Sequence, residues 1–250
     1  HLGRPAYAPI QMKRLEGAVS QFQPDVIHLQ SRSVLSAGSW FARFPEPRIV
    51  LTVHSRAKER SQQVARLRRL DGIIATNEPV REDLVNVEKV SKELIQTIPA
   101  GVDTRRIDAH ATRPLFANPV RLVGTVGPVE SERGQALFIK AIPPIIEQFP
   151  DAYFVVAGEG PSLRELRRLA ASLSLERHVT FVTDFARYED IIETLDLVVY
   201  TSLEDVSAFS LLEAMAWGRP VISFGTPTVG SIVEHGRTGL LVNRGDVQGL

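Results

Sequence analysis

Two acidic residues in unlike surroundings stand eight positions apart in the stretch LEDVSAFSLLEAMAWGRPVI, residues 203–222. Asp205 lies in a loop-like segment after an apolar run, whereas Glu213 lies inside an apolar segment with the pattern of a helix. A carboxylate can accept hydrogen bonds from paired hydroxyl groups, such as those of a ribose. The spacing is consistent with Glu213 as a ribose ligand and Asp205 as a contact to the hydroxyl groups of a second sugar.

A structural interpretation of Glu213 fits the same spacing. Ser210 and Glu213 are three residues apart, as in a capping box, where a serine caps a helix and the later glutamate bonds back to it. In that case the helix begins at Ser210. In the functional interpretation, Glu213 projects from the first turn of the helix into a crevice beyond the strands, and the amides of residues 206–209 face the same crevice, where they can bind phosphate. The spacing alone leaves both interpretations open.

Other residues that could do chemistry follow predicted strands. Arg133 is the penultimate residue of the loop GPVESERG and stands at the start of the next predicted helix. A cation beside helix-terminal amides can hold a phosphate; a solvated loop arginine is the alternative. His54 ends the run RIVLTVH and can exchange protons near neutral pH, although a lone histidine at a strand end is more often structural.

The segment AGEGP, residues 157–161, favours a tight turn because it lacks the third glycine of a dinucleotide-binding loop. No histidine and acid have the helical spacing of metal ligands, so we predict no protein-bound metal.

The composition fits a globular protein of one large or two ordinary domains, with 250 residues of which 44% are hydrophobic. Its 29 basic and 29 acidic residues balance, which gives no reason to expect a nucleic-acid partner. The lack of cysteine excludes disulfides and thiolate metal sites. No apolar run approaches the roughly 20 residues of a membrane span. The basic run Arg56–Arg69 favours a solvated helix face, and attraction to anionic lipid stays open.

Short β-branched runs alternate with amphipathic stretches, which predicts an α/β fold with parallel, doubly wound sheets. The predicted strands are Asp25–Gln30, Arg48–His54, Gly72–Thr76, Leu94–Ile98, Val120–Val126, Ala152–Ala157, Val179–Val182, Leu197–Thr201, Val221–Phe224 and Leu240–Val242. The predicted helices are Ser61–Leu70, Pro79–Val90, Gln135–Gln148, Ser162–Leu173, Glu189–Thr194 and Ser210–Trp217. Gly101–Pro119 has little periodicity, so we expect a linker there. Ligands of such sheets bind beyond the carboxyl ends of strands.

Several phrases, in order from Phe22 to Val242, together resemble the family-4 retaining glycosyltransferases, the group 1 family of the GT-B fold. TIPAGVDT resembles the family's IPNGVD, and AGEGPSLRELRRLA with HVTFVTDF resembles its GxGP…L…VxFxG. EDVSAFSLLEAMAWGRPVI resembles its two acids followed by EAMAxGxPVI, and EHGRTGLLV resembles its ExGxTGLLV. Each phrase is moderately specific, and their order makes the match strong.

The resemblance implies two Rossmann-like doubly wound domains that face a cleft. Residues 1–110 would form a partial acceptor-side domain and residues 111–250 the domain that binds the donor. The implied activity moves a sugar from a nucleotide-diphosphate sugar to an acceptor hydroxyl group with retention of anomeric configuration. The family's first strand and its C-terminal helix have no counterpart between His1 and Leu250, so we interpret the chain as a fragment.

The resemblance also assigns roles to single residues. Glu213 matches the acid that binds the nucleotide ribose, and Asp205 matches the acid that contacts the donor sugar. Arg133 matches a lysine that contacts the diphosphate, and His54 matches a histidine that lines the donor–acceptor site. The backbone between the two acids holds the donor, which implies Val206, Ser207, Ala208 and Phe209.

Two departures from the family pattern keep other functions open. Pro128 stands where the family has an arginine that contacts the diphosphate, and Pro227-Thr228 stands where it has a glycine pair. They favour the alternative of a non-catalytic protein that binds sugar nucleotides or acts as a scaffold; a nucleotide-sugar epimerase of similar fold is a third hypothesis.

For the transferase we expect a nucleotide-diphosphate sugar as co-substrate, no further cofactor, and a sugar, glycan or lipid-linked acceptor. We expect a cytoplasmic location, with peripheral membrane contact open.

Overall fold

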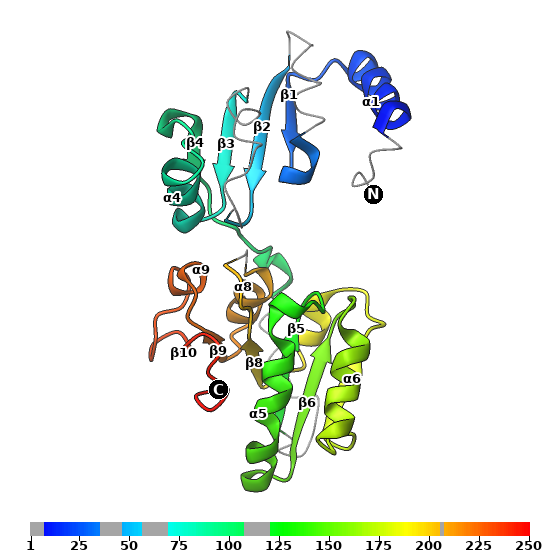
Figure 1. Cartoon of the computed structure of the whole chain (residues 1–250), viewed down its shortest axis with the longest axis vertical. Coiled ribbons are helices and arrows are strands. Elements are labelled where there is room, and N and C mark those ends of the chain that lie inside the picture. The colour runs from blue at the N-terminus through cyan, green and yellow to red at the C-terminus, as the bar shows by residue number, and fades with distance from the viewer. Residues whose placement is uncertain (1–7, 36–46, 57–69, 108–120, 206–207) are drawn as a thin grey trace. The chain divides into compact units, whose positions relative to one another are not determined.

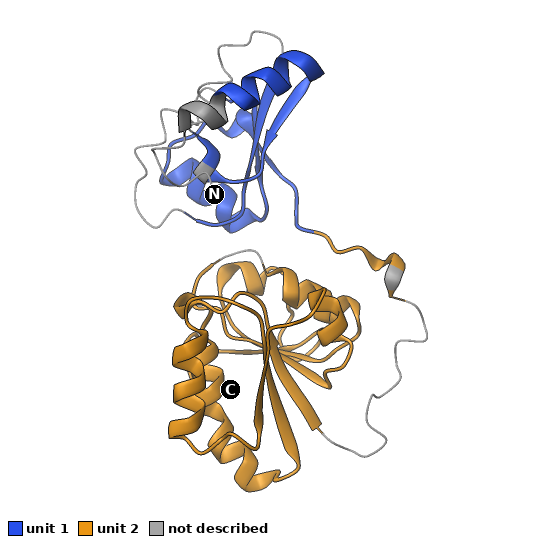
Figure 2. Ribbon diagram, turned by 90° about the vertical axis from the view of Figure 1, so that its right-hand side faces the viewer, with its two compact units in different colours: residues 1–100 blue, residues 101–250 orange. Residues whose placement is uncertain are grey.

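The computed structural model describes residues 8–35, 47–56, 70–107, 121–205 and 208–250. The chain divides into two compact units, residues 1–100 and 101–250 (Figure 2). The boundary falls at the start of the segment that we expect to be a linker, and residues 108–119 of that segment lie outside the described residues. Each unit contains one parallel β-sheet, as the alternation of strand and helix patterns predicts.

The first unit is a four-stranded sheet with helices beside it (Figure 1). In spatial order its strands are β1 (Val26–Leu29), β2 (Arg48–Val53), β3 (Gly72–Ala75) and β4 (Ile95–Thr97). Its helices are α1 (Ala8–Phe22) and α4 (Glu78–Asn86), with 3-10 turns at Arg32–Val34 and Lys92–Leu94. Leu51, Val53 and Ile73 of the two central strands are at most 1% exposed, as expected for strands covered on both faces.

The second unit is a six-stranded parallel sheet in the order β10-β9-β8-β5-β6-β7. The strands are β5 (Arg121–Val126), β6 (Ala152–Ala157), β7 (Val179–Val182), β8 (Leu197–Tyr200), β9 (Val221–Phe224) and β10 (Leu240–Val242). From β5 the chain first adds strands on one side and then returns to pair β8 on the other side. This reversal of strand order creates a crevice at the carboxyl ends of β5 and β8, where ligands of doubly wound folds bind.

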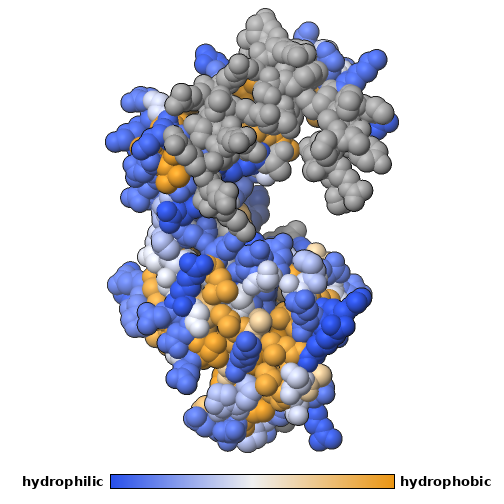
Figure 3. Space-filling view, viewed as in Figure 1, coloured by the Kyte–Doolittle hydropathy of each residue, from blue (hydrophilic) through white to orange (hydrophobic). Residues whose placement is uncertain are grey.

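Helices connect the strands of the second unit: α5 (Gln135–Gln148), α6 (Leu163–Ser172), α7 (Tyr188–Ile192), α8 (Phe209–Ala216) and α9 (Pro227–Gly230). The rings of Phe138 on α5 and Phe154 on β6 meet edge to face, 6.0 Å apart, in the buried layer between helix and sheet. Figure 3 shows apolar side chains scattered between charged ones on the face that carries α5 and α6. Scattered exposure of this kind is normal for a folded domain and marks no site by itself. No helix among the described residues is long and apolar enough to cross a membrane.

All ten predicted strands are present, and their ends agree with the prediction within one residue. The helices agree less well. The helix predicted over Pro79–Val90 ends at Asn86 with Val87 as its C-cap, and Lys89 has a left-handed backbone conformation, φ 56°, that an α-helix does not contain. The helices α1 and α9 were not predicted, and the helix predicted from Ser61 falls, up to residue 69, outside the described residues.

Candidate functional site

A pocket of about 240 Å³ opens at the crevice of the second unit, beyond the carboxyl ends of β5 and β8. Its wall includes the loop after β5, the first residue of α5, the start of α7 and the first turns of α8. Five residues singled out in the sequence line it: Pro128, Arg133, Phe209, Ser210 and Glu213. The structure therefore brings the candidate cation and the candidate ribose ligand to one cavity.

Arg133 lies at the end of a short turn that contacts Thr201, the residue directly after β8. The 3-10 turn Ser131–Arg133 leads into Gly134, which has φ 70° and stands so close that a Cβ atom would lie 2.0 Å from the carbonyl oxygen of Thr201. The Thr201 hydroxyl donates a 3.0 Å hydrogen bond to the carbonyl oxygen of Arg133. The Arg133 side chain is 25% exposed, and its Nε atom lies 3.6 Å from the Glu130 carboxylate. The cation is thus held at the pocket and still partly open to it.

Glu213 does not take part in a capping box, so that interpretation of the sequence is wrong. α8 begins at Phe209 with Ala208 as its N-cap, whose backbone is non-helical and whose side chain makes no capping hydrogen bond. Ser210 is already inside the first turn and cannot serve as the N-cap. No side chain in the described part of the chain is recorded as capping the amide groups of this first turn, and such amide groups can bind an anion.

The Glu213 carboxylate lies on the pocket without a hydrogen-bond or ion-pair partner among the described residues. Partial burial raises its pKa above the usual value for a glutamate, and the nearby negative charge of Glu189 raises it further. A desolvated carboxylate without a partner is costly unless a ligand supplies hydrogen-bond donors. The geometry therefore fits Glu213 as a ligand-binding group better than as a structural one.

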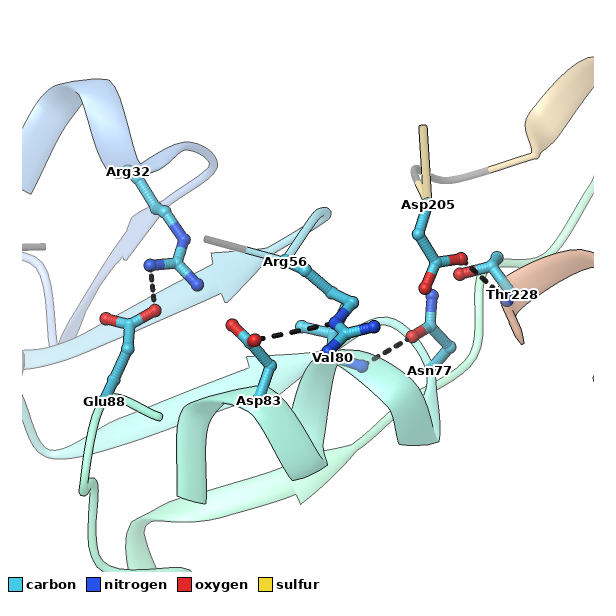
Figure 4. Close-up of polar contacts among 8 residues, drawn as sticks. All are labelled: Arg32, Arg56, Asn77, Val80, Asp83, Glu88, Asp205 and Thr228. Atoms are coloured by element: carbon cyan, nitrogen blue, oxygen red, sulfur yellow. Dashed lines mark hydrogen bonds and ion pairs between the residues drawn. The ribbon is translucent and has the colours of Figure 1, made fainter. Parts of the chain in front are cut away.

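Asp205 is fixed by the first turn of α9. The backbone N–H of Thr228 donates a 2.7 Å hydrogen bond to its Oδ1 atom (Figure 4). The Thr226 side chain caps this helix by accepting a hydrogen bond from Val229 N–H, and Pro227 occupies a first-turn position that suits proline. The segment Pro227-Thr228, which departs from the family pattern, thus builds a helix start that orients Asp205.

His54 follows β2 in the first unit and is half-buried. Two residues further on, the Nε atom of Arg56 lies 3.5 Å from the carboxylate of Asp83, which is 4% exposed (Figure 4). Asp83 belongs to α4, whose start is capped by Asn77 through a 2.9 Å hydrogen bond from Val80 N–H. The ion pair ties the segment after β2 to α4 and so fixes the backbone beside His54.

The remaining candidates have different placements. Ala208 is buried at the N-cap of α8, and Phe209 is 42% exposed at the pocket. Val206 and Ser207 lie outside the described residues. The turn AGEGP does not line the pocket; its Gly158 approaches so closely that a Cβ atom would lie 1.9 Å from the carbonyl oxygen of Gly127. This close approach supports its interpretation as a tight turn.

Several residues that line the pocket were not predicted from the sequence, among them Gln135, Tyr188 and Tyr200. The signal for Tyr200 was present, because a tyrosine followed by threonine and serine ends an otherwise apolar strand. Gln135 directly follows Arg133-Gly134, where the first residue of a helix can turn toward a ligand.

Two family models match the chain. The one described as "Glycosyl transferases group 1" matches residues 120–250, and the one described as "Glycosyltransferase Family 4" matches residues 1–106. Among curated relatives, alpha-monoglucosyldiacylglycerol synthase of Streptococcus pneumoniae is 26% identical over 92% of this chain, which spans 58% of that protein. Alpha-D-kanosaminyltransferase of Streptomyces kanamyceticus is 30% identical over 57% of this chain, which spans 37% of that protein.

A solved structure with a similar fold is that of Anabaena HepE in complex with UDP-glucose. It superposes with a TM-score of 0.79 and 21% sequence identity, covering 99% of this chain and 72% of HepE. The two parallel sheets agree with the GT-B glycosyltransferase architecture. Since the group 1 model alone matches more than half of the residues, the chain belongs to the group 1 glycosyltransferases.

Proposed function

We propose that the protein transfers a sugar from a nucleotide-diphosphate sugar to an acceptor hydroxyl group, with retention of configuration at the anomeric carbon. The observation that carries this proposal is the meeting of Arg133 and Glu213 in one pocket at the start of α8. A guanidinium group and the amides at the start of a helix suit a diphosphate. A carboxylate beside them suits the paired hydroxyl groups of a ribose.

The same groups explain how the donor would be activated. When the glycosidic bond breaks, negative charge develops on the diphosphate and positive charge on the sugar. Arg133 and the amides of α8 stabilise the negative charge on the diphosphate. A fixed cation at a partly buried site stabilises such a charge more strongly than a cation in water does. These groups supply the positive charge, so the proposal includes no metal and no cofactor besides the donor.

Asp205 and His54 are proposed to act on the sugar. Asp205 would accept hydrogen bonds from the donor sugar, and its fixed orientation by Thr228 lowers the entropy that this contact costs. His54 would orient the sugar during the transfer. In the proposed front-face substitution the leaving diphosphate accepts the proton of the acceptor hydroxyl group, which leaves the new bond on the face of the old one.

The relatives support the substrate classes. Both names specify an alpha-linked sugar, which retention yields from an alpha-linked nucleotide sugar, and HepE was solved with UDP-glucose. The pneumococcal relative is named as the synthase of a glucosylated diacylglycerol, which is a lipid. For this protein we propose a nucleotide-diphosphate sugar as donor and a sugar, glycan or lipid-linked hydroxyl group as acceptor. We propose a cytoplasmic location, and peripheral contact to the membrane stays an open alternative.

A second candidate function is binding of sugar nucleotides without catalysis, which Pro128 favours because it removes a cation from the pocket wall. Calorimetric titration of the chain with UDP, GDP, UDP-glucose and GDP-mannose tests the binding that both functions require. Incubation of the full reading frame with the bound donor and candidate acceptors, followed by NMR of the product, tests transfer and retention. Binding without any transfer would favour the second function, and an inverted product would contradict retention.

A further inference from the structure

Two buried polar groups on the pocket lack a hydrogen-bond partner among the described residues: the Tyr200 hydroxyl and the Oε1 atom of Gln135. Tyr200 is 7% exposed and Gln135 is 4% exposed. Buried groups of this kind are rare because an unpaired donor or acceptor loses its water without compensation. Both groups line the cavity that holds Arg133 and Glu213, so a ligand bound in this cavity can supply the missing partner.

The orientation of the Gln135 amide follows from its other contact. Its Nε2 atom donates a 2.8 Å hydrogen bond to the carbonyl oxygen of Pro128. The flipped amide would set Oε1 against that carbonyl oxygen, so that two acceptors would face each other. Oε1 is therefore an acceptor that needs a hydrogen atom from elsewhere, and the position of Gln135 at the start of α5 holds it in place.

Tyr200 offers the complementary chemistry. Burial raises the pKa of its hydroxyl, against a smaller lowering by Arg133 and Ser202, so the phenol stays protonated at neutral pH. Arg133 and Ser202 lie near the hydroxyl without the geometry of a hydrogen bond. The phenol can donate one hydrogen bond and accept another.

An ionised phosphate oxygen carries no hydrogen and cannot satisfy Gln135, whereas a hydroxyl group can donate to Gln135 and accept from Tyr200. We propose that Tyr200 and Gln135 form a subsite for hydroxyl groups of the bound nucleotide sugar. The subsite rests on the proposed function and adds specificity to it, because a site with unpaired buried polar groups discriminates strongly against ligands that lack the matching hydroxyl. The hydroxyl belongs either to the ribose or to the sugar that is transferred.

The test replaces Tyr200 by phenylalanine, which removes one oxygen atom and keeps the packing. The control is Tyr153→Phe, which removes the same group from an exposed position on β6 outside the pocket. Affinity for UDP and for UDP-glucose, or for GDP and GDP-mannose if the protein binds guanine nucleotides, is measured by calorimetry, and the melting temperature is measured without ligand. Tyr200→Phe should weaken binding about two- to tenfold, the effect of one neutral hydrogen bond. Its melting temperature should stay equal or rise, since a buried unpaired group is removed.

The ligands separate the two sources of the hydroxyl group. Equal weakening for nucleotide and sugar nucleotide assigns the subsite to the ribose, and weakening for the sugar nucleotide alone assigns it to the transferred sugar. Unchanged affinity with a lower melting temperature would overturn the subsite, because the hydroxyl would then be bonded within the protein or to a bound water. If the unaltered protein binds none of the four ligands, the proposed function itself fails and the subsite with it.

Discussion

The backbone N–H of Thr228 and the carboxylate of Asp205 form a 2.7 Å hydrogen bond that joins the start of α9 to the loop after β8 (Figure 4). The two segments are more than 20 residues apart in the sequence. The bond shows how a segment that departs from the family pattern orients Asp205, the residue that we propose as a contact to the donor sugar. It fixes one oxygen of Asp205 and makes the orientation of the carboxylate depend on α9.

Asp205→Ala and Asp205→Asn should separate this structural bond from the proposed contact to the sugar. Alanine removes the carboxylate that accepts from the N–H of Thr228, a residue that is 2% exposed. The free energy of unfolding should therefore fall by about 1–3 kcal/mol. Asparagine keeps a carbonyl oxygen and should recover most of that loss. Both variants should lower the rate of transfer strongly and leave affinity for the free nucleoside diphosphate nearly unchanged. Equal losses of affinity for nucleotide and sugar nucleotide would contradict the role of Asp205.

Gly134→Ala should disturb the turn that carries Arg133. The new Cβ atom would lie 2.0 Å from the carbonyl oxygen of Thr201, at a backbone φ of 70°. The matched control is Gly218→Ala, which has φ 64° but no atom within 4 Å of its Cβ position. The control should cost about 1–2 kcal/mol for the left-handed backbone, and Gly134→Ala clearly more, together with a loss of nucleotide affinity. Equal denaturation midpoints for the two variants would show that the close approach to Thr201 is unimportant.

Pro128→Arg should restore a cation at the pocket wall. The hydrogen bond from Gln135 uses the backbone carbonyl of residue 128, so the substitution can keep it. If a diphosphate binds there, affinity should rise by about 1–3 kcal/mol at low salt and by less at high salt. Pro128→Ala controls for the loss of the ring. The same affinity for both variants would place the diphosphate away from residue 128.

Glu88→Gln should weaken the first unit. The Glu88 carboxylate is 0% exposed and pairs with Arg32 (Figure 4). Removing one partner of a buried pair costs about 3–5 kcal/mol, because the other charge stays buried. The control is Glu234→Gln, whose pair with Arg237 is exposed at both ends and should be worth at most about 1 kcal/mol. Chemical denaturation compares the two, and a similar small effect for both would show that Arg32 finds another partner.

The strands were predictable because each is a short β-branched run whose pattern depends on neighbouring residues alone. The helix α1 was missed because its sequence, APIQMKRLEGAVSQF, has a glycine and a weak apolar stripe, and α9 was missed because it has only four residues. Arg133 and Glu213 could be singled out as candidate ligand-binding residues, because each lies in a short sequence motif with a fixed spacing. Tyr200 and Gln135 were missed because their lack of a partner depends on residues far apart in the chain, as the bond between Gln135 and the Pro128 carbonyl illustrates.

The raised pKa of Glu213 gives a pH signature of the free protein. Burial makes the folded state bind the proton more tightly than the unfolded state. The contribution of Glu213 to stability is therefore full below the usual glutamate pKa and is lost as the pH rises through the raised value. Glu213→Gln should remove this dependence and leave the ligand-free protein as stable as, or more stable than, the unaltered one at neutral pH. Urea unfolding of both proteins at pH 4.5 and pH 7 measures the difference.

The most direct test of the account is the affinity of Glu213→Gln for a nucleoside diphosphate, measured by calorimetry together with the melting temperature. If Glu213 binds the ribose hydroxyl groups, affinity should fall by about 1.5–3 kcal/mol, without loss of stability. Glu189→Gln is the matched control, since Glu189 acts on the pKa of Glu213 but does not line the pocket, and it should keep its affinity. An unchanged affinity of Glu213→Gln with a lowered melting temperature would show that Glu213 is structural and would contradict the nucleotide site.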